Sequence, residues 1–192
     1  MKKLIGIGLL LLLAVAFAGC GASQEGNEAT GDSTAPLANP PVAPAPGRGT
    51  ASTTVGGHEM TIDYGRPQLK GRDMLGQFQD GQSWRLGQDQ ATVVQVGTDL
   101  EFGDTRVSAG SYSLFLKKVS SDTWHLIFNS QTGQWGTEHD SSRDVHEIPL
   151  NLGQSDEKVE TFTIALAGGD SAGSLTVSWD TLTLSADFQV AG

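Results

Sequence analysis

Apolar and polar residues alternate in a succession of short segments from about residue 51 to the C-terminus. The clearest segments are 58–64, 92–96, 112–116, 124–128, 161–166, 175–179 and 182–188. A period of two places the apolar side chains of each segment on one face of a β-strand. One residue, Ile127, breaks the alternation within 124–128. The pattern predicts about eight to ten strands.

The connections between these segments are short, which is typical of antiparallel pairing. Gly103 and Asp104 form a tight-turn signal, Asp180 and Thr181 separate the last two segments, and 168–173 reads as a hairpin loop. No long stretch has a helical period, and the best helix candidate is 71–78. We therefore expect an all-β fold, a single antiparallel β-sandwich or jelly roll, with a barrel as the alternative. Pro149 should lie at a sheet edge or end its strand.

The N-terminus has the features of a secretory signal. Residues 1–19 begin with Lys2 and Lys3 and continue as an apolar run ending in small residues. The stretch Phe17-Ala18-Gly19-Cys20 resembles a bacterial lipobox, which implies cleavage before Cys20 and lipid on its thiol. The alternative is an ordinary secretory signal with an incidental Cys. By the same resemblance, Gly21 after the Cys favours a place in the bacterial cell envelope, at the outer membrane and facing the periplasm.

Residues 20–50 differ in composition from the remainder of the chain. They contain five of its seven prolines and no apolar periodicity. Such a segment cannot bury enough apolar surface to offset its ordering entropy, so we expect a flexible, partly extended tether and a domain over 51–192. The alternative is a Pro-rich ligand for a partner, for which Arg48 is the lone basic anchor.

Composition narrows the function. The formal net charge is 12 − 22 = −10, which argues against nucleic acid as a partner. One Cys excludes an internal disulfide framework and any multi-Cys metal site. The four histidines show no strand-spaced pair of ligands, so we predict no metal and no cofactor.

Four basic residues lie close together on this acidic chain, flanked by two aromatic ones. A loop that carries Arg, Lys and an aromatic ring can hold a carboxylate, phosphate or sulfate by forked hydrogen bonds. The alternative is that these basic groups pair with Asp63, Asp73, Asp80 or Asp89 and only fix the loops. The residues of this candidate site are Tyr64, Arg66, Lys70, Arg72, Trp84 and Arg85.

A second candidate is Trp135, within the stretch Asn-Ser-Gln-Thr-Gly-Gln-Trp-Gly at 129–136. An exposed Trp on a loop stacks well on a sugar ring or a partner protein. The alternative is that Trp135 caps the open end of the core.

Several blocks of the chain, YGRPQLKGRDMLG, WRLGQDQAT, AGSYSLFL, WHLIFNSQTGQWG and VETFTI, resemble the bacterial family called domain of unknown function 2911. The resemblance runs from about Thr61 to the C-terminus. It implies an all-β, secreted or lipid-anchored protein and no particular activity. In that family the second block usually reads W-R-x-G-A-N-E-A-T, and here Gln90 replaces the Glu. If that Glu is a base or a metal ligand in relatives, this chain lacks it, which weakens an enzymatic interpretation.

We therefore expect a lipid-anchored envelope module without catalytic residues. It would bind an anionic or carbohydrate-like ligand, or an envelope protein, and contact the membrane through Cys20. The alternatives are a hydrolase that uses the loops around Trp84 and Trp135, and a structural lipoprotein without a small ligand. No P-loop, dinucleotide-binding or nucleophile-elbow motif is present in the sequence.

Overall fold

The computed structural model describes residues 47–192. The predicted signal peptide, the lipidation of Cys20 and most of the predicted tether lie outside the described residues. Within 47–192, no helix has the length and apolar character needed to cross a membrane.

The described residues contain ten strands and two single-turn 3-10 helices, which confirms the all-β prediction. The strands are β1 Arg48–Val55, β2 His58–Gly65, β3 Ser83–Arg85, β4 Thr92–Val96, β5 Leu100–Phe102, β6 Thr105–Val107, β7 Gly110–Lys118, β8 Trp124–Asn129, β9 Asp144–Gly168 and β10 Ala172–Val190. The 3-10 helices are η1 Leu75–Gln77 and η2 Ser141–Arg143.

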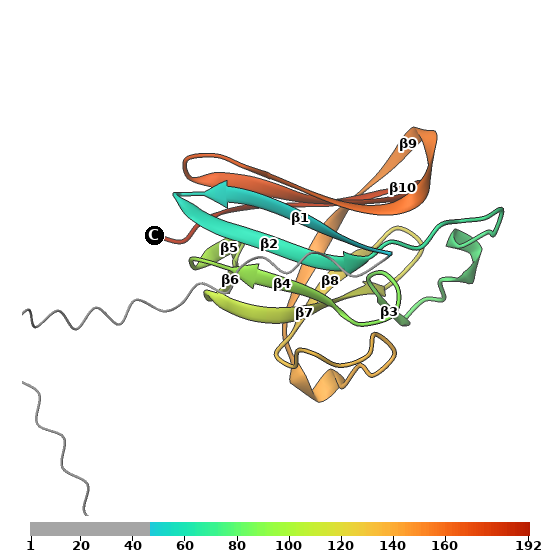
Figure 1. Ribbon diagram of the computed structural model, residues 1–192, viewed down its shortest axis with the longest axis horizontal. Helices are drawn as coiled ribbons and strands as arrows, with labels where there is room; N and C mark the ends of the chain where they lie inside the picture. The colour runs from blue at the N-terminus through green and yellow to red at the C-terminus, as the bar shows by residue number, and fades with distance from the viewer. Residues whose placement is uncertain (1–46) are drawn as a thin grey trace, which may run out of the picture. The chain divides into compact units, whose positions relative to one another are not determined.

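All strand pairs are antiparallel and follow the order β1-β2-β4-β7-β8-β9-β10-β5-β6, with β3 paired to the end of β7. The long strands β9 and β10 form a ribbon that folds over the layer made by β1, β2, β4 and β7 (Figure 1). Apolar side chains from both layers form one core, to which β2, β4, β7, β8, β9, β10, β5 and β6 all contribute. The alternating pattern thus places one face of each strand inward, as predicted.

The corner of the β9–β10 ribbon differs from the sequence prediction. The alternation predicts two strands over 175–179 and 182–188, joined by a turn at Asp180-Thr181, but both segments belong to β10 and both lie beside β9. The register shifts around Asp180, where Val159 is its partner and Gln154 is the partner of Leu182. Asp180 has a φ of 54°, so it makes a bulge that bends the strand.

The sequence pattern does not predict strand β1, because its residues RGTASTTV show almost no apolar alternation. Its eight residues pair with β2 in continuous register through the turn at Gly56 and Gly57, both at positive φ. Two such residues are what a tight hairpin turn requires. Residues 48–50, which composition assigns to the tether, therefore belong to the sheet.

The loop after β2 crosses to β9 and joins the two layers. Leu69 donates its backbone N–H to the carbonyl of Glu160 at 2.9 Å, and Phe162 donates to the carbonyl of Pro67 at 2.9 Å. The helix candidate at 71–78 shortens to the single turn of η1, within this loop region.

Pro149 lies inside β9 and does not end it. The residue faces His125 of β8, while the pairing of β9 with β10 begins only at Asn151. On that second side Pro149 therefore needs no backbone donor, so the strand behaves locally as an edge strand, as proline requires.

Arg48 fixes the beginning of the described chain to the sheet. Its guanidinium is almost fully buried and forms an ion pair with Asp63, with Nε 2.6 Å from a carboxylate oxygen. It also donates to the carbonyls of Asp63 and Gln90, both at 3.2 Å. Arg48 is thus engaged within the domain and is not available as the basic anchor of a Pro-rich ligand.

Arg48→Met keeps most of the apolar stem and removes the guanidinium. We expect the free energy of unfolding to fall by about 1–3 kcal/mol, because Asp63 and the carbonyls lose charged hydrogen bonds in a partly buried place. Urea unfolding measures this loss. The matched control is Arg106→Met, which breaks the surface pair with Asp99 and should cost much less; equal losses would contradict the assignment.

His146 of β9 lies edge-on to the rings of Tyr112 and Phe128, with centroids 6.3 Å away in both cases. Burial lowers the pKa of His146 from its ordinary value of 6.5, because the charged ring loses hydration there.

The unfolded chain therefore takes up the proton of His146 at a higher pH than the folded one. With respect to His146, the free energy of unfolding is therefore highest above the unfolded-state pKa near 6.5. It decreases as the pH falls from there through the folded-state pKa. His146→Gln should flatten this part of the pH profile measured by urea unfolding. The exposed His58→Gln should leave it unchanged, and an unaltered profile in His146→Gln would refute the prediction.

Candidate functional site

The outer face of β7 and β8 is covered by the loop 130–143. Beneath it, Ala91, Phe115 and Ile127 form a second small apolar cluster, separate from the core. This explains why Ile127 breaks the alternation of β8: the strand is buried on both faces there. The sequence signal was the extra apolar residue on each of two neighbouring strands.

Asn129, which is fully buried, holds both ends of this loop together. Its amide donates to the carbonyl of Asp140 at 2.8 Å and to the carboxylate of Asp144 at 2.7 Å. Its oxygen accepts the backbone N–H of Gln131 at 3.0 Å. One buried side chain thereby satisfies donors and acceptors from the beginning and the end of the loop.

His139 closes the loop onto the apolar cluster. Its ring stacks on Phe115, with centroids 4.1 Å apart and planes 22° from parallel. Its Nε2 lies 2.8 Å from the carboxylate of Asp144. The ring is therefore fixed in position and orientation on the outer face of the sheet.

The segment 134–136 pairs with residues 89–91. Ala91 donates to the carbonyl of Gln134 at 3.1 Å, Gly136 donates to the carbonyl of Asp89 at 2.8 Å, and Gln90 forms a β-bridge with Trp135. Trp135 is 47% exposed and lies outside the core cluster. Its side chain is therefore exposed to solvent on the outside of the domain.

Arg85 lies beside this segment. On β3 it faces Phe115 of β7, and a Cβ added at Gly136 would lie 2.9 Å from its Cδ. The residue is half-buried, yet within 47–192 its guanidinium forms no ion pair and no hydrogen bond. The structure therefore places Arg85 against Gly136, the residue that follows Trp135, although the sequence suggested two separate clusters.

Gln134 adds a buried amide next to these residues. Its Oε1 accepts the Ser113 hydroxyl at 3.4 Å, whereas its Nε2 is buried without a partner among the described residues. A buried N–H without an acceptor is unfavourable. We name Arg85 and Trp135 the Arg85 site.

The two other aromatic candidates lie in the interior. Tyr64 is buried, and its hydroxyl donates to the carbonyl of Ile164 at 3.2 Å. Trp84 is half-buried and stacks on Trp179, with centroids 5.4 Å apart and planes 17° from parallel. Both rings contribute to packing between the layers.

The three other basic candidates lie along the loop that comes after β2. The side chain of Arg66 lies over Gly49, Lys70 is exposed, and Arg72 donates to the carbonyls of Leu69 at 3.0 Å and Gln68 at 2.7 Å. No hydrogen bond or ion pair within residues 47–192 links these three side chains to one another or to Arg85.

The carboxylates considered as partners for the basic candidates are engaged elsewhere. Asp63 pairs with Arg48, Asp80 lies 3.2 Å from Lys118, and Asp73 accepts the backbone N–H of Gly76 at 2.9 Å. Within residues 47–192, none of these three acids forms an ion pair with Arg66, Lys70, Arg72 or Arg85.

A neighbouring ionic group on the outer face is internally matched. Glu147 lies 3.0 Å from Lys117 and 2.6 Å from His125. Burial acts to raise the pKa of Glu147, but the hydrogen bonds from His125 and Lys117 outweigh it and hold the pKa below its ordinary value. The charges of Glu147, Lys117 and His125 therefore compensate one another, whereas the guanidinium of Arg85 has no ion-pair partner within 47–192.

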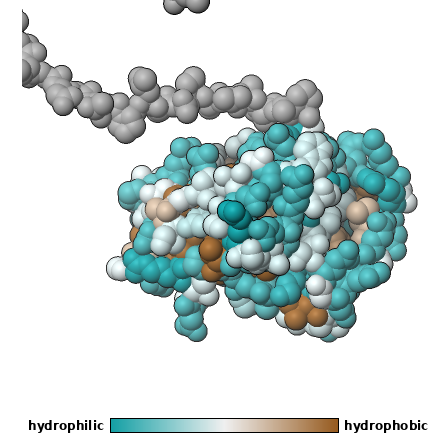
Figure 2. Space-filling view, turned by 90° about the horizontal axis from the view of Figure 1, so that it is seen from below, coloured by the Kyte–Doolittle hydropathy of each residue, from teal (hydrophilic) through white to brown (hydrophobic). Residues whose placement is uncertain are grey.

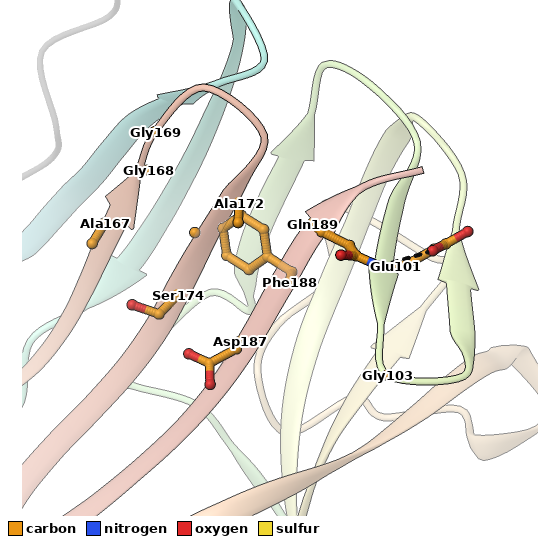
Figure 3. Close-up of a pocket in the computed structure, with 11 residues that line it drawn as sticks. Glu101, Gly103, Ala167, Gly168, Gly169, Ala172, Ser174, Asp187, Phe188 and Gln189 are labelled. Atoms are coloured by element: carbon orange, nitrogen blue, oxygen red, sulfur yellow. Dashed lines mark hydrogen bonds between the residues drawn. The ribbon is translucent and has the colours of Figure 1, made fainter. Parts of the chain in front are cut away.

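A surface groove of about 660 Å³ lies where the first and last parts of β10 diverge (Figure 3). Its walls carry mostly small residues, with Ser174 and Asp187 on one side and a hydrogen bond of 3.2 Å from Gln189 to Glu101 on the other. It contains acids and no cation, so it offers no complement to an anion.

The face of the domain shown in Figure 2 is mainly hydrophilic, with isolated apolar residues.

Metal ligation has no basis in the described part of the chain, where no group of three or more potential His, Cys, Asp or Glu ligands converges. The Arg85 site instead contributes N–H donors, and its chemistry suits an anion.

The fold and this site define a small all-β domain with a donor-rich outer face. The chain belongs to the family described as a protein of unknown function, DUF2911, whose model matches residues 46–188. The family resemblance noted in the sequence is thereby confirmed. No curated protein and no solved structure gives a significant match.

Asn129→Ala removes the contacts that hold the loop 130–143. We expect the free energy of unfolding to fall by about 1–3 kcal/mol, because buried polar groups lose their partners. Hydrogen exchange should also accelerate within 130–143. The control Thr132→Ala changes an exposed residue of the same loop and should alter neither. Unchanged exchange in Asn129→Ala would contradict the assignment.

Proposed function

We propose that this protein is a non-catalytic binding module, held in the bacterial cell envelope by lipid on Cys20, which captures a carboxylate-bearing, sugar-like ligand at the Arg85 site. The anchor and the location are supported by the sequence of residues 1–20. The ligand class is supported by the geometry around Arg85.

The observation that carries the proposal is the contrast between two arginines. Of the arginines within residues 47–192, only Arg48 and Arg85 are not exposed. Arg48 has a carboxylate and several carbonyls around its guanidinium, whereas Arg85 has no such partner among the described residues. Taking a cation partly out of water without compensation is unfavourable, and an anion bound from solution would provide it.

The surroundings of Arg85 select the kind of anion. A guanidinium presents parallel N–H groups that match the two oxygens of a carboxylate. The exposed ring of Trp135 offers a flat apolar surface on which a sugar ring can stack. A uronic acid combines the required carboxylate, ring and hydroxyl groups.

One observation favours the alternative, an envelope hydrolase. His139 and Asp144 form a histidine–carboxylate pair at 2.8 Å near the Trp135 loop, an arrangement that can orient a general base. Among the described residues, however, no Ser or Thr hydroxyl forms a hydrogen bond with His139. A hydrolysis assay separates the two functions: the wild type should not hydrolyse p-nitrophenyl glycosides or esters, whereas hydrolysis that His139→Gln abolishes would favour the hydrolase.

The test uses the full chain with Cys20→Ser, so that no lipid is attached. D-galacturonate at about ten times its dissociation constant should raise Tm by about 3–6 °C. Arg85→Met should abolish this shift. The control Arg66→Met removes an exposed guanidinium and should retain it. A full shift in Arg85→Met, or no shift with galacturonate or phosphate in the wild type, would refute the proposal.

A further inference from the structure

A cleft of about 450 Å³ lies at one corner of the domain, between η1, the adjacent ends of β7 and β8, and the bend of the β9–β10 ribbon. Its apolar lining is Leu75, Trp124, Leu152 and Leu182, and Lys118 lies at its edge. We propose that this cleft binds a single medium-length acyl chain that ends in a carboxylate, with the carboxylate at Lys118. This site shares no residue with the Arg85 site and does not depend on the proposed function.

The cleft results from the irregular pairing at the ribbon corner. Asp180 pairs with Val159, but Leu182 pairs with Gln154, so residues 155–158 of β9 have no counterpart on β10. The ribbon opens at this point, and both Gln154 and Leu182 line the resulting cleft. Because the bulge is built into the register, the opening is a fixed feature of the fold.

The walls expose apolar surface that the fold itself does not cover. Leu152 is 43% exposed, and it is one of four large hydrophobic residues that are exposed within 47–192. A second one, Val119, directly follows Lys118. Leu75 and Leu182 pack against the core from the other side, and Trp124 is buried. A ligand with an aliphatic chain would remove the exposed part of this surface from water.

Lys118 provides the polar end of the site. Its ammonium lies 5.9 Å from the ring centroid of Trp124, 3.1 Å from the carbonyl of Phe78 and 3.2 Å from the carboxylate of Asp80. An ammonium has three N–H donors, so a third remains for a ligand oxygen. The side chain of Asp80 is 59% exposed and can remain solvated while the ligand carboxylate approaches.

Size and charge together limit the ligand. The volume is in the range of small-molecule sites and is too small for a folded partner. Lys118 is the single cation among the lining residues, and a ligand carboxylate at the end of one chain would share its ammonium with the exposed Asp80. An uncharged chain would fill the cleft but would offer no carboxylate to the Lys118 ammonium.

The test is calorimetric titration of the full chain carrying Cys20→Ser with hexanoate, octanoate and decanoate. Each added methylene should lower Kd about fourfold until the cleft is full. Lys118→Met should weaken decanoate binding about tenfold while leaving the binding of decanol unchanged. Leu152→Glu introduces a charge into the wall and should abolish decanoate binding.

The matched control is Val145→Glu, which places the same charge at another exposed apolar residue of β9, 47% exposed and outside the cleft. It should bind decanoate like the wild type, and circular dichroism should show the same fold for both Glu variants. Absence of saturable binding, affinity that does not increase with chain length, or equal loss in both Glu variants would overturn the proposal. Retained galacturonate binding by Leu152→Glu would show that such a failure concerns this cleft alone.

Discussion

The organisation of the molecule depends on a packing constraint that lies outside its core. Phe115 and Ile127 point away from the interior of the sandwich, and the loop 130–143 must cover them. The stack of His139 on Phe115 and the hydrogen bonds of Asn129 hold that loop in place. Because the loop is held there, its segment 134–136 pairs with residues 89–91 and brings Gly136, next to Trp135, against Arg85. A burial requirement of two apolar side chains thus assembles the donor-rich surface that we propose as a binding site.

The same sheet shows how irregular pairing produces features that regular strands lack. The bulge around Asp180 bends the β9–β10 ribbon, allows it to cover the other layer, and opens a cleft at the corner. The ion pair between the buried Arg48 and the half-exposed Asp63 has the opposite character, since the Arg48 guanidinium is compensated by a carboxylate and by carbonyls. Compared with that pair, the guanidinium of Arg85 and the amide of Gln134 are groups whose hydrogen-bonding capacity the described protein does not use.

Period-two alternation was sufficient to predict the all-β class, most strands and the hairpin at Gly103-Asp104, because those signals are local. The same alternation predicts that Tyr64 faces inward, because Tyr64 lies on the same face of its strand as Met60 and Ile62. The pattern could not predict strand β1, because backbone pairing with β2, rather than apolar side chains, holds it in the sheet. The proximity of Arg85 to Trp135 could not be read from the sequence, since it depends on a long-range register between a loop and a strand end. For the same reason Asp180-Thr181 looked like a turn, although both flanking segments lie along β9.

We propose that Arg85, whose guanidinium has no ion-pair or hydrogen-bond partner within residues 47–192, holds a carboxylate next to Trp135. The most direct measurement is a two-dimensional NMR titration that follows the Nε–H signals of the arginines and the indole N–H signals of the tryptophans while D-galacturonate is added. We expect saturable shifts of the Arg85 and Trp135 signals with one common dissociation constant, while the signals of Arg48, Arg66 and Trp179 remain in place. Shifts confined to Arg66 and Arg72, or signals of Arg85 and Trp135 that do not respond, would contradict it.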